Sequence, residues 1–259
     1  MRKNYRFNIS YDGTRFYGWE HQPNTDMTIQ GKIETVLTRM VHPEITTDTI
    51  PENIKIIEVL GAGRTDAGVH AKGMVANAFL DTEYSEEEIR DYMNRYLPDD
   101  IRIDNVSVAG DRFHSRYNAL GKTYCYSCYA GKTKPLFDRK YVYVLDEVPD
   151  IKRMQEAANL LMGEHDFASF CSNPKMKKST VRLVDMIDIK QDGDYIRFTY
   201  HGSGFLQHMV RILTGTLLEV GFGKRTPENM TELIEIKKRA LAGPTAPACG
   251  LCLIKVDYH

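Results

Sequence analysis

The chain lacks an excess of positive charge and a long apolar run. Its 259 residues carry 34 Lys and Arg against 35 Asp and Glu, a formal net charge of −1. Overall charge therefore gives no sign of nucleic-acid binding, although a local basic stripe is compatible with a neutral sum. No apolar stretch has the length of a membrane span, so we expect no membrane contact. The N-terminal residues lack the apolar core of a signal peptide, which predicts a cytoplasmic protein.

Local basic stripes do occur in the second half of the chain. They lie at residues 175–182, 223–225 and 237–239. Each stripe taken alone is more typical of a solvated surface than of a binding site.

Cysteine is scarce, and its number is odd. Five cysteines without an export signal exclude a disulfide framework. Two CxxC pairs, Cys125 with Cys128 and Cys249 with Cys252, together have the number of ligands that zinc requires. The first pair falls in a predicted strand, where residues three apart point to opposite faces. We therefore expect no metal, and no HExxH pattern supports one; Cys171 is expected to pack as a small hydrophobe.

The first half of the chain has the periodicity of a small α+β domain. We expect Thr28 to cap the first helix, and Ser85 with Glu88 to form a capping box before a helix that ends at Pro98. The order strand-helix-strand-strand-helix-strand is typical of the split βαβ, or ferredoxin-like, pattern. The predicted strands are 4–11, 55–60, 74–80 and 101–108, and the predicted helices are 29–41 and 89–97.

The second half has a similar but longer pattern. Gly193 marks a turn between two of its strands, and we expect a domain boundary near Gly110, which gives domains 1–110 and 111–259. The predicted strands are 122–129, 141–145, 180–191, 195–201 and 251–258, and the predicted helices are 151–162, 205–220 and 227–242.

A glycine-rich segment, GAGRTDAGVHA at residues 61–71, carries the most chemistry. Its glycines allow unusual backbone conformations and close approach of a ligand. It contains Arg64 and Asp66, and a guanidinium nearby keeps a carboxylate ionised and able to attack an electrophilic carbon. The residues by themselves favour a simpler interpretation, a structural turn in which Asp66 caps backbone amides and pairs with Arg64.

Two nucleotide-binding motifs are excluded for this segment. The glycines have the spacing GxGxxxxG rather than GxGxxG, and the residues that follow are a poor helix start. The pattern GxxxxGK[ST] of a phosphate-binding P-loop does not occur in the chain.

Taken together with other segments, the glycine-rich segment resembles the TruA family of tRNA pseudouridine synthases, the tRNA pseudouridine(38–40) synthases. The matches occur in the family's order and span nearly the whole chain, which makes the set specific. The other matching segments are YDGT at 11–14, FYGW at 16–19, TIQG at 28–31, KTYCY at 122–126, GFLQHMVR at 204–211 and APACGL at 246–251.

The resemblance implies a reaction and a set of catalytic residues. Enzymes of this family break the N-glycosidic bond of uridine, turn the base and rejoin it through carbon five, without a cofactor. Asp66 would be the catalytic nucleophile, with Tyr124 and Arg211 as further catalytic residues. A tyrosine ring can stack on an extruded base, and its hydroxyl can move a proton. Helical periodicity places Arg211 opposite the apolar face of the predicted helix, so we expect it off the core.

The same resemblance implies residues that bind the substrate. Arg64 matches a position that helps to displace the target nucleotide. The other implied substrate-binding residues are Tyr124, His70, His208 and Leu251, and the two histidines are expected to be structural or to contact RNA.

The resemblance also implies an architecture and partners. We expect two ferredoxin-like α+β domains with joined antiparallel sheets and a cleft between them that holds Asp66. We expect a homodimer that binds tRNA and modifies uridine at positions 38, 39 and/or 40 of the anticodon stem-loop.

Three different functions stay open on the sequence alone. The segment at residues 169–178, which is variable in the family that the chain resembles, leaves room for a paralogue that acts on a different RNA. A non-catalytic RNA-binding or chaperone protein of the same fold would keep the fold without the reaction. A metal-dependent nucleotide enzyme would instead use the CxxC pairs.

Overall fold

The computed structural model describes residues 2–47, 49–173 and 175–259. Met1, at the start of the N-terminal segment, and Pro174, in the segment 169–178, lie outside the described residues. The chain has the expected α+β class, with mainly antiparallel strands. It divides into two compact units: unit 1 comprises Met1–Leu120 with Leu253–His259, and unit 2 comprises Gly121–Cys252. Among the helices of the described ranges, none is both long and apolar enough to cross a membrane.

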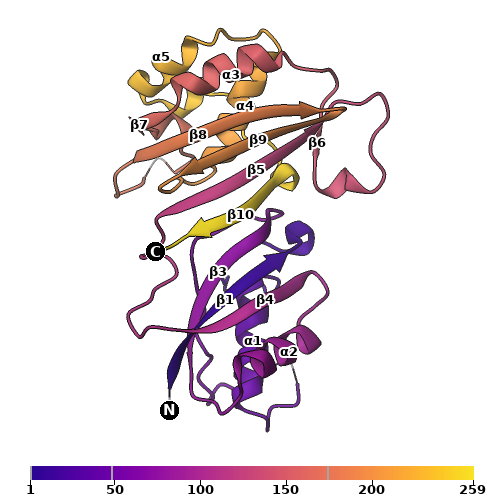
Figure 1. Ribbon diagram of the computed structural model, residues 1–259, viewed down its shortest axis with the longest axis vertical. Coiled ribbons are helices and arrows are strands. Elements are labelled where there is room, and N and C mark those ends of the chain that lie inside the picture. The colour runs from indigo at the N-terminus through magenta and orange to yellow at the C-terminus, as the bar shows by residue number, and fades with distance from the viewer. Residues whose placement is uncertain (1, 48, 174) are drawn as a thin grey trace. The chain divides into compact units, whose positions relative to one another are not determined.

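Unit 1 has the strand order of the split βαβ pattern. Its strands run in the order β4-β1-β3, and β2 lies beside β3, with every pair antiparallel. Helices α1 and α2 lie on one side of these strands (Figure 1). The bounds are β1 Lys3–Tyr11, β2 Leu60–Gly61, β3 His70–Leu80, β4 Ile101–Ala109, α1 Ile29–Val41, α2 Glu86–Tyr96 and a 3-10 turn, η1, at Gly13–Arg15.

The elements of unit 1 follow from their local sequence. The alternation in β1 places its apolar side chains on one face, and Phe7 and Ile9 are fully buried there. The Thr28 side chain caps α1 by accepting from Gly31 N, and the capping box of Ser85 and Glu88 opens α2. These three sequence predictions are confirmed.

The strand expected at 55–60 is wrong over most of its length, because only Leu60–Gly61 is a strand. The backbone before it is hydrogen-bonded to side chains of α1 instead of to a neighbouring strand. Ile57 N donates to Thr38 Oγ1 at 3.0 Å, and Val59 N donates to a carboxylate oxygen of Glu34 at 3.0 Å. Residues 55–59 therefore have the composition of a strand but run beside α1, whose side chains accept hydrogen bonds from their backbone N–H groups.

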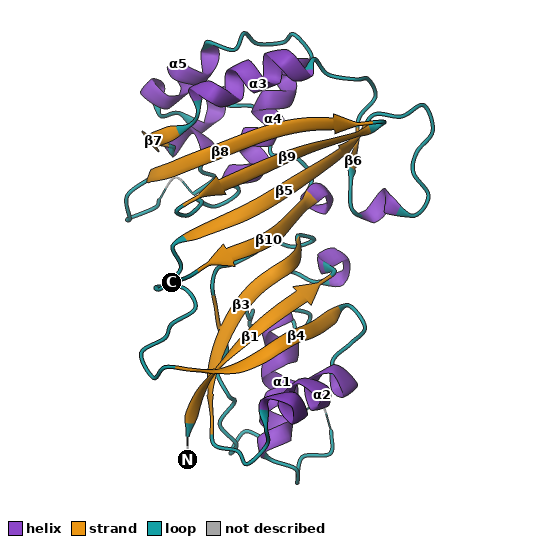
Figure 2. Cartoon of the chain, viewed as in Figure 1, coloured by secondary structure: helices purple, strands orange, loops and turns teal. Residues whose placement is uncertain are grey.

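Unit 2 has a second antiparallel set of strands with helices on one side (Figure 2). Its strand order is β5-β9-β8-β7, and the short β6 runs parallel beside β5. The bounds are β5 Gly121–Tyr129, β6 Tyr143–Val144, β7 Gly163–Asp166, β8 Val181–Asp192, β9 Tyr195–Gly202, α3 Ile151–Leu160, α4 Met209–Gly221 and α5 Asn229–Ile236. Its 3-10 turns are η2 Asp138–Lys140, η3 Ala168–Phe170, η4 Arg239–Leu241 and η5 Ala248–Gly250.

Several boundaries in unit 2 differ from the sequence prediction. Helix α4 begins at Met209 rather than at residue 205, because His208 has a left-handed φ of 60°. Helix α5 ends at Ile236 rather than at 242, because Lys237 has a φ of 54°. A left-handed residue interrupts helical hydrogen bonding, and periodicity does not reveal where it falls. Strand β7 was not expected, and β6 is shorter than predicted.

The two units divide at Leu120 and Gly121, later in the chain than the expected boundary near Gly110. The division also falls inside β10, Leu251–Asp257, since Leu253–His259 belongs to unit 1. The C-terminal strand is therefore not wholly part of the second half.

We predict that the cap of α1 contributes measurably to stability. Replacing Thr28 by Ala leaves the N–H of Gly31 without its side-chain acceptor and should lower the free energy of unfolding by about 1 kcal/mol. Thr28→Ser keeps the hydroxyl and should retain most of the stability. Urea unfolding of the three proteins tests this, and a Thr28→Ala variant as stable as the unsubstituted protein would contradict it.

Candidate active site

The segment 61–71, here called the Asp66 loop, connects β2 to β3 in unit 1. Val69 N donates to Asp66 O at 3.1 Å, which closes a four-residue turn. The third residue of that turn, Gly68, has a φ of +78°, a conformation that side chains other than glycine's rarely adopt. Asp66 is half-buried at the start of the turn. The turn that the residues alone favoured is therefore present, and it holds the carboxylate where solvent reaches it.

Residues 11–19, here called the clasp, hold the Asp66 loop on both sides of Asp66. Before it, Trp19 N donates to Thr65 O at 3.0 Å, and Thr65 Oγ1 lies 2.8 Å from the hydroxyl of Tyr11. After it, Gly68 N donates to Phe16 O at 3.2 Å. These contacts fix the backbone that carries the carboxylate.

Gly18 allows the clasp to come this close. Its φ is +101°, and a Cβ at this position would lie 2.7 Å from Thr65 O and 3.2 Å from the backbone of Asp66. A side chain here would be strained by the backbone conformation and would push against the loop. The glycine is therefore required by the contact between the two segments.

His70 lies at the end of the loop and is buried, with 6% of its surface exposed. Gly13 N donates to its Nδ1 at 3.1 Å, which requires a lone pair on that nitrogen. Asp12 Oδ1 lies 3.2 Å from the same nitrogen, and it becomes a hydrogen-bond acceptor there only when Nδ1 is protonated. These contacts tie His70 to the clasp.

Arg64 is exposed and makes an ion pair with Glu20 at 2.5 Å. The sequence prediction named Asp66 as its partner. Arg64 instead pairs with Glu20, the residue that follows the clasp, and this ion pair links the Asp66 loop to the end of the clasp. Because both side chains are largely exposed, this contact adds little stability and leaves the guanidinium accessible.

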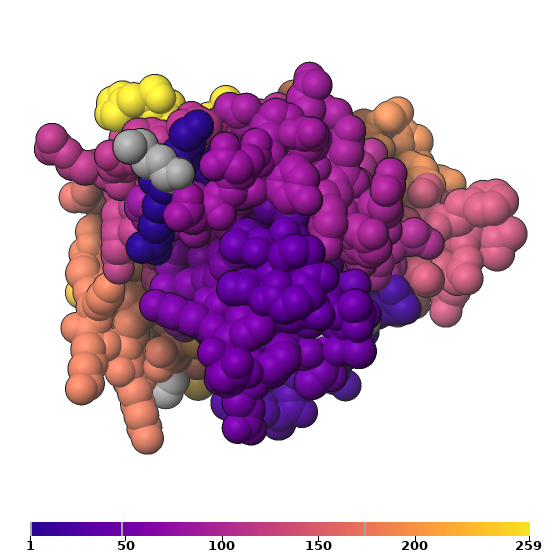
Figure 3. All heavy atoms as spheres, turned by 90° about the horizontal axis from the view of Figure 1, so that it is seen from below, coloured from indigo at the N-terminus to yellow at the C-terminus, as the bar shows by residue number. Residues whose placement is uncertain are grey.

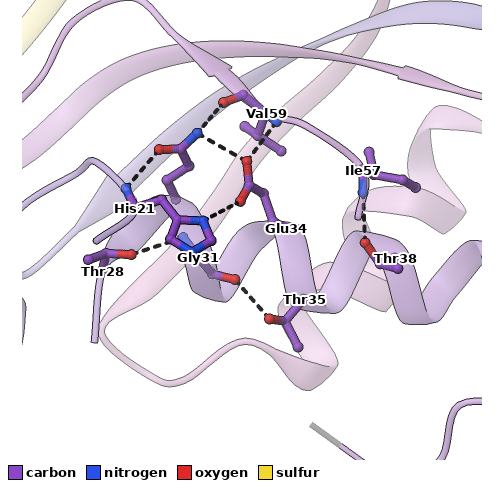
Figure 4. A network of polar contacts seen from close by, with 9 residues as sticks. His21, Thr28, Gly31, Glu34, Thr35, Thr38, Ile57 and Val59 are labelled. Atoms are coloured by element: carbon purple, nitrogen blue, oxygen red, sulfur yellow. Dashed lines mark hydrogen bonds and ion pairs between the residues drawn. The ribbon is translucent and has the colours of Figure 1, made fainter. Parts of the chain in front are cut away.

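A partly buried polar network supports the clasp and the backbone that leads into the Asp66 loop (Figure 4). Backbone bonds tie α1 to the clasp, since Ile29 N donates to Gly18 O and Gln30 N donates to Trp19 O. The Gln30 amide donates to Val59 O and to a Glu34 carboxylate oxygen, both at 3.0 Å. Glu34 accepts from Val59 N, and its second oxygen lies 3.3 Å from Nδ1 of His21. One helix thus holds both the clasp and the chain entering β2.

Burial raises the pKa of Glu34 above its usual value, and this loss of hydration outweighs the hydrogen bonds from Val59, His21 and Gln30 that lower it. The carboxyl is almost fully buried, with 5% of the residue exposed. Glu34 is therefore a buried titratable group in the network that holds the backbone before the Asp66 loop.

Ser115 is a second support that sequence reasoning missed. It is fully buried, its hydroxyl donates to Leu60 O, and its N–H donates to the side chain of Asn77 at 2.9 Å. Gln30 lies in the segment TIQG, which matches the family, and this match could have indicated its role. The bonds of Glu34 to Val59 and of Ser115 to Leu60 and Asn77 carry no local signal, because these partners are distant in sequence.

The remaining predicted site residues lie in unit 2. Tyr124 on β5 is 9% exposed, and its ring packs edge-on against Phe205 at 5.3 Å between centroids. Arg211 on α4 is half-buried, and its Nε donates to Ala246 O at 2.8 Å. Arg211 is less buried than the residues that follow it, as expected, but the single apolar face expected for this helix is wrong, since residues 212–218, which cover every face of the helix, are all buried. His208 precedes α4, and Leu251 is buried at the start of β10.

The structure thus groups the predicted residues in two sets. Asp66, Arg64 and His70 share one loop of unit 1. The set in unit 2 consists of Tyr124, His208, Arg211 and Leu251.

The CxxC pairs are poor metal sites. Cys125 and Cys128 lie on opposite faces of β5, one half-buried and one buried. Burial raises the pKa of the Cys128 and Cys249 thiols, whereas zinc binds thiolates. Across the described ranges, no three His, Cys, Asp or Glu side chains are grouped so as to hold a metal ion.

The profile of the tRNA pseudouridine synthase family matches residues 8–118 and 157–259, which includes the clasp, the Asp66 loop and Arg211. The chain belongs to this family. It is 42% identical to "tRNA pseudouridine synthase A" of Bacillus sp. (strain KSM-64), over 98% of this chain and 99% of that protein. It is 38% identical to "tRNA pseudouridine synthase A 2" of Clostridium perfringens (strain 13 / Type A), over 99% of this chain and 100% of that protein.

A chain from the solved "Cbf5-Nop10-Gar1 Complex" matches at a TM-score of 0.38 and 14% identity, over 96% of this chain and 49% of that one; this likeness is too weak to bear on fold or function. Membership in the tRNA pseudouridine synthase family makes the chain an isomerase and confirms the resemblance drawn from its motifs.

We predict that Gly18→Ala disturbs the Asp66 loop. The new methyl group would lie too close to Thr65 O. The alanine would also have to keep the positive φ of Gly18, which costs about 1 kcal/mol or more. Pseudouridine formation should fall at least about tenfold, and the melting temperature should fall as well. Gly110→Ala is the matched control, because nothing lies within 4 Å of a Cβ there. Equal activity and stability in both variants would contradict the role of the clasp.

We also predict a pH-dependent effect of Glu34 on stability. A carboxyl whose pKa is raised by folding holds its proton more tightly when folded, so its protonated form is the one that favours folding. As pH rises from the usual 4.5 through the raised pKa, the protein should lose stability relative to Glu34→Gln. Urea unfolding of both proteins between about pH 3 and 8 measures the difference.

Glu88 is the control of opposite sign. Hydrogen bonds from Ser85 lower its pKa, so the protein should gain stability relative to Glu88→Gln as pH rises through that lowered pKa to 4.5. The prediction for Glu34 would be contradicted if the stability of the unsubstituted protein, relative to that of Glu34→Gln, stayed constant or increased as pH rises.

Proposed function

We propose that the chain isomerises uridine to pseudouridine at positions 38, 39 and/or 40 of the tRNA anticodon stem-loop, with Asp66 as the nucleophile acting on a flipped nucleotide. The observation that carries the assignment of Asp66 is the hold of the clasp on either side of it. The positions in tRNA come from the family resemblance.

The geometry around Asp66 suits a nucleophile. It is the only carboxylate of the Asp66 loop, and it is half-buried rather than sealed from solvent. Because the bonds at Thr65 and Gly68 restrain the backbone, the carboxylate requires little reorganisation to meet a substrate. An ionised carboxylate in a fixed position can form and release a covalent bond to a nucleoside.

The bonds balance without a cofactor. The bond between nitrogen one of uracil and the ribose breaks, and a bond between carbon five and the ribose forms. The proton on carbon five is lost, and nitrogen one gains a proton. The bond to Asp66 forms and breaks again within the cycle, so the carboxylate is regenerated and the product is an isomer of the substrate.

Tyr124 and Arg211 complete the proposed catalytic set. Phe205 packs against the ring of Tyr124 and limits its rotation, which favours stacking on a base or transfer of a proton from its hydroxyl. Ala246 O holds Nε of Arg211, which orients the guanidinium.

The proposed substrate-binding residues differ in exposure. Arg64 is exposed, and His208 is half-buried, so both side chains can meet RNA. His70 and Leu251 are each 6% exposed, and their contribution is to the position of neighbouring residues. Tyr124 serves in both sets.

The oligomeric state and location are part of the same proposal. The family resemblance supports a homodimer, and similarity to bacterial tRNA pseudouridine synthases supports the cytoplasm. Light scattering of the purified protein tests the first, and fractionation of cells tests the second.

We predict that Asp66→Ala and Asp66→Asn abolish pseudouridine formation, with a rate loss of at least about 10³-fold, because the nucleophile is removed. Affinity for tRNA should stay within about threefold of normal. Asp111→Asn, at an exposed position outside the loop, is the control and should react normally. A pseudouridine-specific chemical readout on unmodified tRNA also maps the uridines modified.

Each outcome decides something. Equal product from the unsubstituted protein and Asp66→Ala would overturn the role of Asp66. Product at uridines outside positions 38–40, or in another RNA, would overturn the proposed target. No product from any variant, with tRNA binding retained, would favour a non-catalytic RNA-binding protein.

A further inference from the structure

The connection between β5 and β6, residues 130–142 and here called the β5–β6 arm, is more basic than the chain as a whole. It carries four cations and one carboxylate, Asp138, in a chain whose net charge is −1. All four cations are exposed, and they are Lys132, Lys134, Arg139 and Lys140. Figure 1 shows the connection extending beyond the ends of the two strands that it joins.

The same arm exposes large apolar side chains. Phe137 is 84% exposed and Leu136 is 67% exposed, and Phe137 is the most exposed large hydrophobic residue of the described ranges. In Figure 3 rose-coloured atoms of this part of the sequence are visible at the surface. Neighbouring exposed apolar side chains among charges are typical of an interaction surface.

The arm is anchored in unit 2 rather than loose. At its start Ala130 N donates to Asp194 O at 2.8 Å, and at its end Val142 is buried. Within it Tyr141 N donates to Asp138 O, and the Asp138 carboxylate accepts from the hydroxyl of Tyr195 at 2.6 Å. The single acidic group of the arm therefore faces β9, while the cations remain exposed.

We infer that the β5–β6 arm is a contact surface for tRNA. Its lysines would bind backbone phosphates, and the ring of Phe137 would stack on an unpaired base. Phosphate contacts by Lys and Arg provide affinity without reading sequence, and aromatic stacking suits any base. This inference rests on the proposed function for its ligand, an RNA, but it does not depend on the role of Asp66.

A second copy of the chain is the competing occupant of this surface. If the arms of two copies met across a two-fold axis, their cations would face like charges. A polyanion instead satisfies the four cations and the ring together. The charge of the arm therefore favours RNA.

Substitutions at Phe137 separate stacking from simple apolar burial. Phe137→Ala should raise the Kd for unmodified tRNA about tenfold, because a stacked base is lost. Phe137→Tyr should bind like the unsubstituted protein, whereas Phe137→Leu should bind like the Ala variant. The rate of pseudouridine formation in a single turnover at saturating enzyme should stay unchanged in all three.

The charges are tested with a matched pair. Lys132→Gln with Lys134→Gln should reduce the slope of log affinity against log salt concentration by about 1.4 to 1.8, since each phosphate contact contributes about 0.7 to 0.9. Lys152→Gln with Lys190→Gln removes two exposed charges of unit 2 outside the arm and should leave the slope unchanged. Light scattering of every variant reports its oligomeric mass.

Normal tRNA affinity and salt dependence in the arm variants would overturn the inference. A change of mass in Phe137→Ala that Phe137→Leu does not show would assign the arm to contact between copies, and would overturn it too. These results are distinct from failure of the proposed function. If the unsubstituted protein makes no pseudouridine but the arm variants lose tRNA affinity, the arm assignment stands and the catalytic one falls.

Discussion

The grip of residues 11–19 on the Asp66 loop is the interaction on which the proposed active site depends. Backbone bonds from Trp19 and Phe16 hold the loop before and after Asp66. A turn of this kind has few hydrogen bonds of its own, and without the clasp its carboxylate would sample many positions. The glycine at position 18 follows from this contact, since a side chain there would separate the two segments.

The clasp is in turn held by α1, and this connects the stability of unit 1 to the geometry of the loop. Glu34 and Gln30 bind the chain at Val59, just before β2, while the first residues of α1 bind the clasp. Holding the backbone at Val59 with a buried carboxyl is costly, because the ionised form of the carboxyl loses hydration. Its hydrogen bonds also specify one register of the chain entering the loop, which an apolar contact would leave less defined.

Unit 2 shows how a chain with a formal net charge of −1 can have a cationic surface. The β5–β6 arm is one such surface, with four exposed cations and one acidic residue, which is bound by Tyr195. Local concentration matters more than the sum, because salt screens charges beyond roughly 10 Å. The chemistry of Asp66 and the surface of the arm can therefore be altered separately.

The α+β class, the caps at Thr28 and Ser85, the buried face of β1 and the family of the chain can all be predicted from the sequence. Each of these follows from local periodicity or from motifs. The folded chain was needed to show that residues 55–59 run beside α1 without forming a strand, that α4 starts after His208, and that Arg64 pairs with Glu20. The physical reason is that periodicity reports which faces are apolar, whereas hydrogen-bond partners and left-handed residues depend on segments that meet only when the chain is folded.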